Sequence, residues 1–460
     1  MYSLASQLFP ICRSITGNGV RDTLKLLQDL IPLKIHEVPT GTPVFDWKVP
    51  QEWNIHDAYI KDADGNRVVE FRQSNLHIVN GSQDIQATMC WDELKENLHT
   101  LPDQPDWIPY RTCFHQEDWG FCLTHNQYLE LESLGNEQYE VCIDATMKDG
   151  SLTYGEFFIP GETDEEVLLS SHICHPSLAN DNLSGIAVAT HLAQFIGTRK
   201  RRYGYRFVFA PATIGSITWI SQNQDQLSKI KHGLILSLLG DAGNTTYKKT
   251  RMGNAEIDRA VQCVLSHTDA DYTINEYEPF GYDERQYGSP GINLPVGCFM
   301  RTPNAQYPEY HTSADNLDLV QPQYLADSLD KLVQVIELLE GNVYPQNLKP
   351  MCEPQLGKHG LYKAFGTEGN DAEFQKAILW VLNLADSKHS LLDIAERSKI
   401  AFPVIRNATD ALQDAGLISN HNSTNYLCAA ETSSPVSICC DAIDPCIDHN
   451  DLSTTNSTSG

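Results

Sequence analysis

The chain has 460 residues, 41% of them hydrophobic, and its 33 Lys and Arg residues against 60 Asp and Glu residues give a net charge of −27. This length exceeds what one core usually holds, so we expect two to four domains. The charge argues against binding to nucleic acid or to an anionic membrane. The N-terminus lacks the basic and apolar stretches of a secretory signal, and no run reaches the ~18 apolar residues of a membrane span. We therefore expect a cytoplasmic protein whose thirteen scattered cysteines are reduced thiols.

The first 150 residues show two different patterns. Residues 1–45 contain a helical stripe of apolar side chains, formed by Val20, Leu24, Leu27 and Leu30. Residues 46–149 are rich in Trp, Tyr and Asp and contain turn pairs such as Asp64-Gly65, with short alternating runs between the turns. We predict that residues 46–149 form a small β-rich domain inserted into a domain that residues 1–45 begin.

Residues 150–345 alternate between short apolar runs and helical stretches. The apolar runs lie at 167–169, 207–209, 234–239 and 296–300. Strands that alternate with helices indicate an α/β fold around a largely parallel sheet. We predict that residues 1–45 and 150–345 form one such domain.

The C-terminal part reads as a small helical domain followed by a tail. Residues 374–385, 391–398 and 402–416 have helical patterns whose spacing suits a helix-turn-helix. The third helix carries Arg406 against Asp410 and Asp414, so it lacks the basic face that DNA binding needs. We expect residues 346–420 to contact protein or cap the main domain. Residues 421–460 contain no Lys or Arg and many Ser and Thr, a composition that predicts disorder.

The segment Ser170–Gly185 carries the strongest chemical signal. It places His172, His175 and Asp181 between a predicted buried strand and an amphipathic helix. Ligands of open α/β sheets bind at the carboxyl ends of the strands, and an imidazole with a carboxylate there suits Zn²⁺. The structural alternative is that Asp181 only caps the helix. A second polar segment, Pro308–Asn316, offers another imidazole at His311.

Both segments resemble motifs of di-zinc aminopeptidases. Asp181-Asn182-Leu183-Ser184-Gly185 is similar to their metal-bridging turn, and Tyr310-His311-Thr312-Ser313-Ala314-Asp315 is similar to their closing motif. More closely, residues 5–420 resemble a bacterial aminopeptidase-like family, through further signatures at 9–17, 47–53 and 281–287. The resemblance implies a zinc-aminopeptidase-like sheet flanked by helices, with an inserted β-rich domain and a C-terminal winged helix. It also implies a link to polysaccharide biosynthesis, because members lie near such genes.

The chain departs from the di-zinc pattern at three positions. Ala212 stands in the segment where these enzymes have a Glu-Glu pair, Ser237 replaces an Asp ligand, and Cys174 replaces the Asp that follows the first His. The resemblance therefore implies a mononuclear zinc site of His172, Asp181 and His311 with an open position, and Asp315 could orient a neighbouring ligand.

The general base must then come from another carboxylate, and we select Glu284 and Asp241 as candidates. For Glu284 the structural alternative is an ion pair. We assign substrate contacts to His175, Tyr282 and Tyr310. The resulting prediction is zinc-dependent hydrolysis of a peptide or amide bond in a small peptide or an aminoacylated substrate.

Two other functions stay open. One is a non-catalytic binding or scaffold protein that keeps the aminopeptidase shell, which the absent carboxylates favour. The other is a transcriptional regulator with a ligand-sensing hydrolase-like domain, against which the charge argues. We expect no nucleic-acid or membrane partner, and we leave open whether the chain forms a homo-oligomer.

Overall fold

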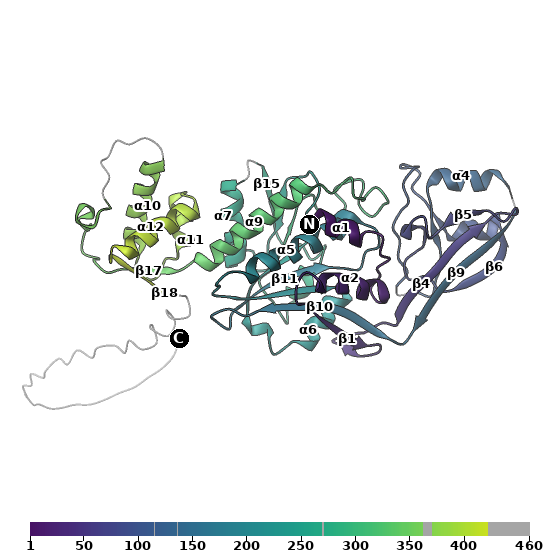
Figure 1. Ribbon diagram of the computed structural model, residues 1–460, viewed down its shortest axis with the longest axis horizontal. Coiled ribbons are helices and arrows are strands. Elements are labelled where there is room, and N and C mark those ends of the chain that lie inside the picture. The colour runs from purple at the N-terminus through teal and green to yellow at the C-terminus, as the bar shows by residue number, and fades with distance from the viewer. Residues whose placement is uncertain (115, 136, 269–270, 362–369, 422–460) are drawn as a thin grey trace, which may run out of the picture.

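The computed structural model describes residues 1–421 except 115, 136, 269–270 and 362–369. The predicted tail at 421–460 lies outside the described residues from 422 onward. Figure 1 shows three parts in a row: the helices α10–α12 at one end, a sheet flanked by helices in the centre, and a second sheet at the other end. Within these described ranges, no helix is long and apolar enough to cross a membrane.

The central sheet has eight strands in the order β1-β10-β12-β11-β13-β16-β14-β15. Its middle strands β12, β11, β13 and β16 run parallel, and antiparallel strands flank them. In sheet order the bounds are Lys34–Pro39, Ser151–Ile159, Gly204–Ala210, Glu166–His172, Ile230–Leu236, Val296–Met300, Thr245–Lys248 and Tyr272–Asn275. Every residue of β11 and β12 is buried, as expected of parallel strands with both faces covered.

Helices cover both faces of this sheet. On one face lie α1 (Tyr2–Leu8), α2 (Asn18–Gln28), α5 (Gly185–Gly197), α7 (Glu256–Thr268) and α9 (Pro322–Gly341). On the other face lie α6 (Ile214–Gln222) and α8 (Glu284–Tyr287). The layered architecture, with helices on both sides of a mostly parallel sheet, confirms the predicted α/β fold class. The predicted apolar stripe is buried at Val20, Leu24 and Leu27, whereas Leu30 lies beyond the end of α2 and is 40% exposed.

The N-terminal segment belongs to the central sheet, because β1 pairs with β10 over six residues. The chain then passes through the hairpin of β2 (Pro43–Val44) and β3 (Trp47–Lys48) into a separate four-stranded sheet, in the order β5-β4-β9-β6. Its strands are β4 (Glu52–Lys61), β5 (Arg67–Glu70), β6 (Ile85–Cys90) and β9 (Gln138–Lys148). This part, the inserted domain, also contains α3 (Trp91–Leu94), α4 (His125–Ser133) and the short pair β7 (Leu98–His99) and β8 (Phe121–Cys122). Strand β9 returns directly to β10 of the central sheet.

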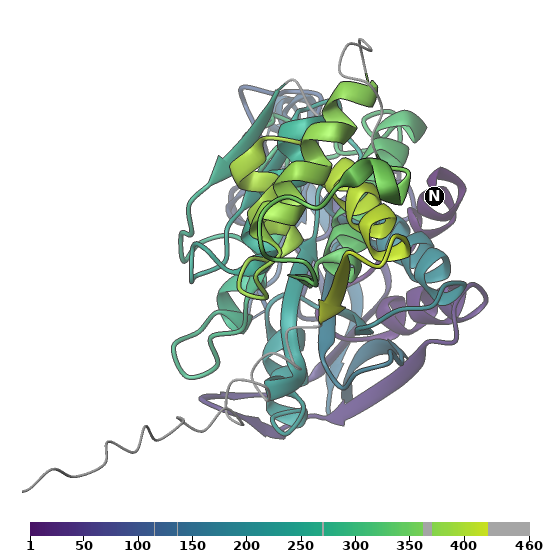
Figure 2. The same ribbon diagram turned by 90° about the vertical axis from the view of Figure 1, so that its left-hand side faces the viewer.

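The C-terminal domain consists of three helices and a two-stranded sheet. Its elements are β17 (Tyr344–Asn347), α10 (Asn370–Leu384), α11 (Leu391–Ser398), α12 (Phe402–Asp414) and β18 (Ile418–His421). Ser390 caps α11 by accepting a hydrogen bond from the backbone N–H of Asp393. The apolar core of this domain is continuous with that of the central helices. Figure 2 shows its helices in front of the central part.

Ion pairs and hydrogen bonds hold this interface. The guanidinium of Arg259 on α7 pairs with Asp393 and Glu396 on α11, each at 2.6 Å. Arg406 of α12 donates a hydrogen bond of 2.8 Å to the carbonyl of Gly341 at the end of α9. The single arginine of the third helix therefore contributes to the contact between the domains.

Candidate metal centre

The two segments singled out in the sequence meet at the carboxyl edge of the central sheet. His172 is the last residue of β11, and Asp181 lies in a short irregular helix, Ala179–Ser184, that precedes α5. Asp181 has the non-helical angles φ −108° and ψ 81°, and the Asp181–Asn182 peptide bond is cis. His311 lies in the loop that leads toward α9. The fold thus places His172 and His311 beside Asp181.

Three imidazoles surround the carboxylate of Asp181. Its Oδ1 lies 2.8 Å from Nε2 of His172, and its Oδ2 lies 3.1 Å from Nε2 of His311. Nε2 of His175 lies 3.9 Å from the same Oδ2. Ligand atoms of His172, His175 and Asp181 all lie within 4.8 Å of one another. We call these four residues the metal cluster. The side chains of Asp181 and His172 are 0% and 1% exposed, whereas that of His311 is 35% exposed, so the cluster opens to solvent on the His311 side.

Burial and neighbouring charges shift the pKa values of Asp181 and His175. Burial opposes the ionisation of Asp181, but the charge of His175 and hydrogen bonds from His172 and His311 outweigh it and hold the pKa of this carboxyl well below its usual range. Burial lowers the pKa of His175 to about 3, because the charge of Asp181 only partly compensates. At neutral pH, Asp181 is thus a carboxylate and His175 a neutral imidazole, as metal ligation requires.

Hydrogen bonds fix the turn that carries Asp181. The carboxylate of Asp315 accepts bonds from the backbone N–H groups of Asn180 (2.6 Å) and Asp181 (3.0 Å). The amide of Asn182 donates to Ser171 Oγ (2.9 Å) and accepts from the N–H of Leu238 (3.2 Å), which ties the turn to two strand ends. Asp315 therefore acts on the cluster through the backbone, as a supporting residue.

Two of the predicted substrate-binding residues stack on the cluster. The ring of Tyr310 lies 3.9 Å from that of His311 with an interplanar angle of 12°, and the ring of Tyr282 lies 5.0 Å from that of His172 at 18°. Tyr282 is buried, and Tyr310 is partly exposed. The third residue predicted to bind substrate, His175, lies among the potential metal ligands.

The two predicted base residues have other partners. Glu284 is 0% exposed and forms an ion pair with Lys248 of β14, so its structural alternative, an ion pair, describes its position. Asp241 accepts hydrogen bonds from Thr302 Oγ1 (2.6 Å), the N–H of Gly243 (2.6 Å) and the amide of Asn180 (2.9 Å). Neither carboxylate belongs to the metal cluster, so the structure does not bring these two to the residues predicted to bind zinc.

Sequence reasoning did not find Tyr110, which the inserted domain places over the cluster. Its N–H donates a 2.8 Å hydrogen bond to the carbonyl of His311, and Pro109 forms a β-bridge with Thr312. The ring of Tyr110 lies 5.1 Å from that of His311 and 5.2 Å from that of His175. Nothing in the local sequence marks this residue, because its partners are some 65 and 200 positions away.

Arg13 is the second residue that sequence reasoning left without a role. It lies in the signature segment 9–17, is only 1% exposed, and donates hydrogen bonds to the carbonyls of His175 (2.8 Å) and Leu8 (2.7 Å). Burial lowers its pKa to about 10, so it remains charged at neutral pH. Through its bond to the carbonyl of His175, Arg13 holds the loop between His172 and Asp181 in place.

Replacing Tyr110 with alanine is expected to weaken zinc binding about tenfold, because the rings of His175 and His311 lose the side chain that packs on them. Tyr110→Phe keeps the ring and should bind zinc like the wild type. Tyr128→Ala, which removes a tyrosine that packs on Trp91 inside the inserted domain, is the control. Competition with a chromophoric chelator measures the affinities. Equal affinity of Tyr110→Ala and wild type would exclude a role for Tyr110 at the cluster.

Together, the sheet order, the helices on both faces and a His/Asp cluster at the carboxyl edge define an aminopeptidase-like α/β protein. Solved structures agree. The zinc aminopeptidase of Bacillus subtilis aligns over 73% of this chain and 93% of its own with a TM-score of 0.54 and 12% identity. A peptidase M28 precursor of Shewanella amazonensis aligns over 74% and 92%, with a TM-score of 0.52 and 13% identity. At such identities the likeness concerns the fold alone.

The chain belongs to the family described as domain of unknown function DUF4910, which matches residues 2–342, and residues 343–420 match a winged helix-turn-helix family. A Clostridium acetobutylicum protein is 51% identical over 419 residues, which cover 91% of this chain and 95% of that protein. It is provisionally named a polysaccharide biosynthesis protein with an aminopeptidase-like domain. A crystal structure from the same organism, described provisionally as a peptidase, has a TM-score of 0.86 and 49% identity and covers 91% of this chain and 96% of its own. The predicted family membership is thereby confirmed.

Proposed function

We propose that this protein is a zinc-dependent, aminopeptidase-like hydrolase of a peptide or amide bond. Its substrate would be a small peptide or an aminoacylated compound, linked to polysaccharide biosynthesis as the name of the Clostridium relative suggests. The observation that carries the proposal is the metal cluster, in which three imidazoles converge on one buried carboxylate at the edge where α/β proteins bind their ligands.

The donor set fits zinc. Imidazole nitrogen and carboxylate oxygen are ligands that Zn²⁺ takes in proteins, and a catalytic site combines three protein ligands with one open position. His172, Asp181 and His311 would hold the ion. When bound, Zn²⁺ polarises a carbonyl group and lowers the pKa of its coordinated water to about 7.

The residues around the cluster would orient the ligands and the substrate. Nδ1 of His172 and Oδ1 of Asp283 are both buried and have no hydrogen-bond partner among the described residues. A hydrogen bond between these two atoms, which the structure does not contain, would fix the orientation of the His172 ring, as carboxylates near zinc ligands commonly do. Tyr310, partly exposed beside His311, would form a wall of the substrate site. Glu284 could transfer a proton at the cluster only if its ion pair with Lys248 broke, and Asp241 only if its hydrogen bond from Thr302 broke.

A second candidate function is a non-catalytic, metal-stabilised binding protein, and the position of His175 favours it. If His175 is a fourth ligand, the site has no open position and resembles closed structural zinc sites. The bonds that Glu284 and Asp241 already make also support the non-catalytic function, because a hydrolase of this type needs a free carboxylate beside the bound water.

The two functions differ in what His175→Ala does. We would measure zinc stoichiometry and affinity, and the hydrolysis of a panel of dipeptides and aminoacyl-p-nitroanilides, for the full chain and this variant. The hydrolase proposal expects zinc-dependent turnover by the wild type, and zinc retention by His175→Ala with impaired turnover. Zinc binding without turnover of any substrate, together with zinc loss in His175→Ala, would replace it with the binding function.

A further inference from the structure

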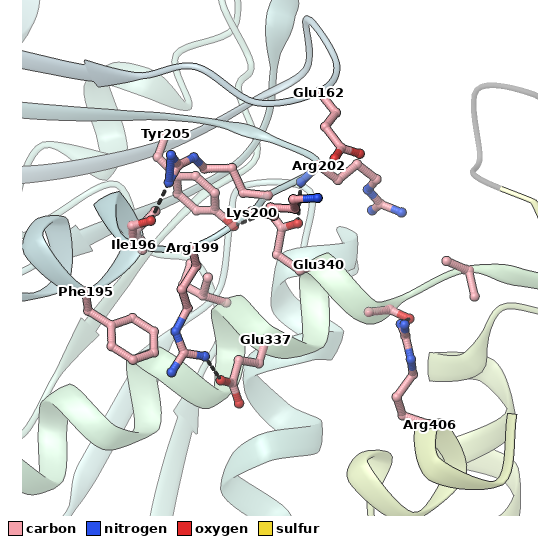
Figure 3. Close-up of a pocket in the computed structure, with 14 residues that line it drawn as sticks. Glu162, Phe195, Ile196, Arg199, Lys200, Arg202, Tyr205, Glu337, Glu340 and Arg406 are labelled. Carbon is pink, nitrogen blue, oxygen red and sulfur yellow. Dashed lines mark hydrogen bonds and ion pairs between the residues drawn. The ribbon is translucent and has the colours of Figure 1, made fainter. Parts of the chain in front are cut away.

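A cavity of about 490 Å³ lies between the central part and the C-terminal domain. It is lined by the end of α5, the loop that follows it, the last turns of α9, and Arg406 of α12. Figure 3 shows Arg199 beside Glu337, with Arg406 reaching from α12 on the other side. The volume of the cavity is within the range of about 300–1,000 Å³ that small-molecule sites occupy.

This cavity is separate from the metal cluster. The loop that lines it precedes β12, and the register pairs Glu166 with Gly204 at that edge of the sheet. His172 pairs with Ala210 at the other edge, six residues further along both strands. At ~3.3 Å per residue the two edges are about 20 Å apart. A ligand in the cavity would therefore bind away from the cluster.

The cavity loop is the most basic segment of an acidic protein. Residues 199–202 read Arg-Lys-Arg-Arg in a chain whose net charge is −27. Part of this charge stabilises helix ends, since Arg201 donates to the carbonyl of Ile196 in α5, and Arg202 to that of Leu339 in α9. Cations at helix C-termini are favourable. These bonds use only part of each guanidinium.

Two glutamates of the cavity have partners within the same cavity lining. Glu337 pairs with Arg199 at 2.9 Å. Glu340 accepts hydrogen bonds from the backbone N–H of Arg202 (2.6 Å) and from the hydroxyl of Tyr205 (2.7 Å). Because the donors to Glu340 are uncharged, these bonds pair it with no cation. The cavity is lined by five cationic side chains against three glutamates.

Arg406 pairs with Asp410 at 3.1 Å, whereas Lys200, Arg201 and Arg202 form no ion pair with another described residue. Arg202 is only 8% exposed, and its side chain donates to neutral oxygens alone, those of Leu339, Asn342 and Tyr203. Over the described part of the chain, no hydrogen bond or ion pair engages the ammonium of Lys200. A buried guanidinium without a carboxylate is costly, and a bound anion would offset that cost. The apolar side chains of Phe195, Ile196 and Ile336 line the rest of the cavity.

We propose that this interdomain cavity binds a small organic phosphate. The phosphate group would lie against Lys200, Arg201 and Arg202, and the organic part would lie against the apolar wall. Phosphate suits this set because its oxygens accept several charge-assisted hydrogen bonds from lysine and from the arginine fork. Since Arg406 comes from the C-terminal domain, the ligand contacts both domains and strengthens their association.

The test is a titration of the full-length protein, followed by calorimetry and by the melting temperature, with glucose 1-phosphate, adenosine diphosphate and inorganic phosphate. Sodium chloride at matched ionic strength is the blank. We expect saturable binding of at least one organic phosphate, about tenfold or more tighter than inorganic phosphate. Lys200→Ala should raise its Kd about tenfold, the worth of one charge-assisted hydrogen bond, and Lys200→Glu should abolish binding.

Lys25→Ala is the control, since Lys25 is 65% exposed on α2 and does not line the cavity. It should bind like the wild type. Lys200 makes no hydrogen bond or ion pair with another described residue, so its replacement should leave the fold intact. No saturable binding of either organic phosphate, equal affinity for inorganic phosphate, or a Kd unchanged by Lys200→Ala would each overturn the proposal. These binding measurements do not depend on zinc or on hydrolytic activity.

Discussion

Replacing Asp181 with alanine should weaken zinc binding by about 100-fold, so that the purified variant carries almost no metal. Asp181 is the carboxylate that all three imidazoles of the metal cluster approach. Zinc binding at structural sites is worth ~10–16 kcal/mol, so the loss of one of the three proposed ligands should cost at least about 3 kcal/mol, which is roughly a hundredfold in affinity. His172→Ala and His311→Ala should act in the same direction. Elemental analysis and chelator competition measure the effect.

His232→Ala is the control for this series. Its imidazole is also buried, with Nε2 3.2 Å from the hydroxyl of Tyr203, but it lies near the start of β13, toward the opposite edge of the sheet from the cluster. This variant should keep the zinc content of the wild type. If all three ligand variants retained zinc at wild-type stoichiometry, the metal site would lie elsewhere in the chain.

Arg13→Met should both destabilise the fold and weaken zinc binding. The change removes the donor to the partly buried carbonyl of His175, at a cost of ~1–3 kcal/mol, whereas the carbonyl of Leu8 keeps the N–H of Ile11 (3.1 Å) as a donor. We therefore expect a loss of about 1–3 kcal/mol in the free energy of unfolding, measured by chemical denaturation. The freed loop should also lower zinc affinity by about 10-fold or more, as loss of supporting residues around a metal does.

Arg21→Met separates the two effects. Arg21 of α2 pairs with Glu37 (2.9 Å) and Glu52 (2.6 Å) and has no contact with the cluster. Its replacement should cost stability while zinc affinity stays at the wild-type value. Should Arg13→Met bind zinc as tightly as Arg21→Met, Arg13 would be a purely structural residue.

The sequence was informative where chemistry and periodicity act locally. The apolar runs at 167–169, 207–209, 234–239 and 296–300 all fall in strands of the central sheet or directly at their ends. Strand ends that share an edge bring their polar residues together, which is why His172 and Asp181 could be selected before their distance was known. The pairing of His311 with them rested on the resemblance to aminopeptidases.

Long-range partners set the limit of this reasoning. Glu284 was selected as a candidate base because of the loop in which it lies. Its partner Lys248 is on β14, some 36 residues earlier, and no local sequence pattern predicts that ion pair. Tyr110 belongs to a domain with its own sheet, and only the β-bridge between Pro109 and Thr312 brings it to the cluster. Such contacts depend on how whole domains pack, which hydrophobic periodicity does not encode.

The bridge between Pro109 and Thr312 makes the inserted domain and the metal cluster mechanically dependent on each other. On both sides of it, backbone hydrogen bonds of 2.8 Å join Tyr110 to His311 and Ser313 to Ile108. A displacement of the inserted domain would pull on the loop that carries His311, the most exposed member of the cluster. Conversely, a metal held by His311 would fasten a domain that supplies no ligand of its own. Excising that domain, or exchanging it for that of a relative, would therefore not be a modular operation, because zinc affinity would change with it.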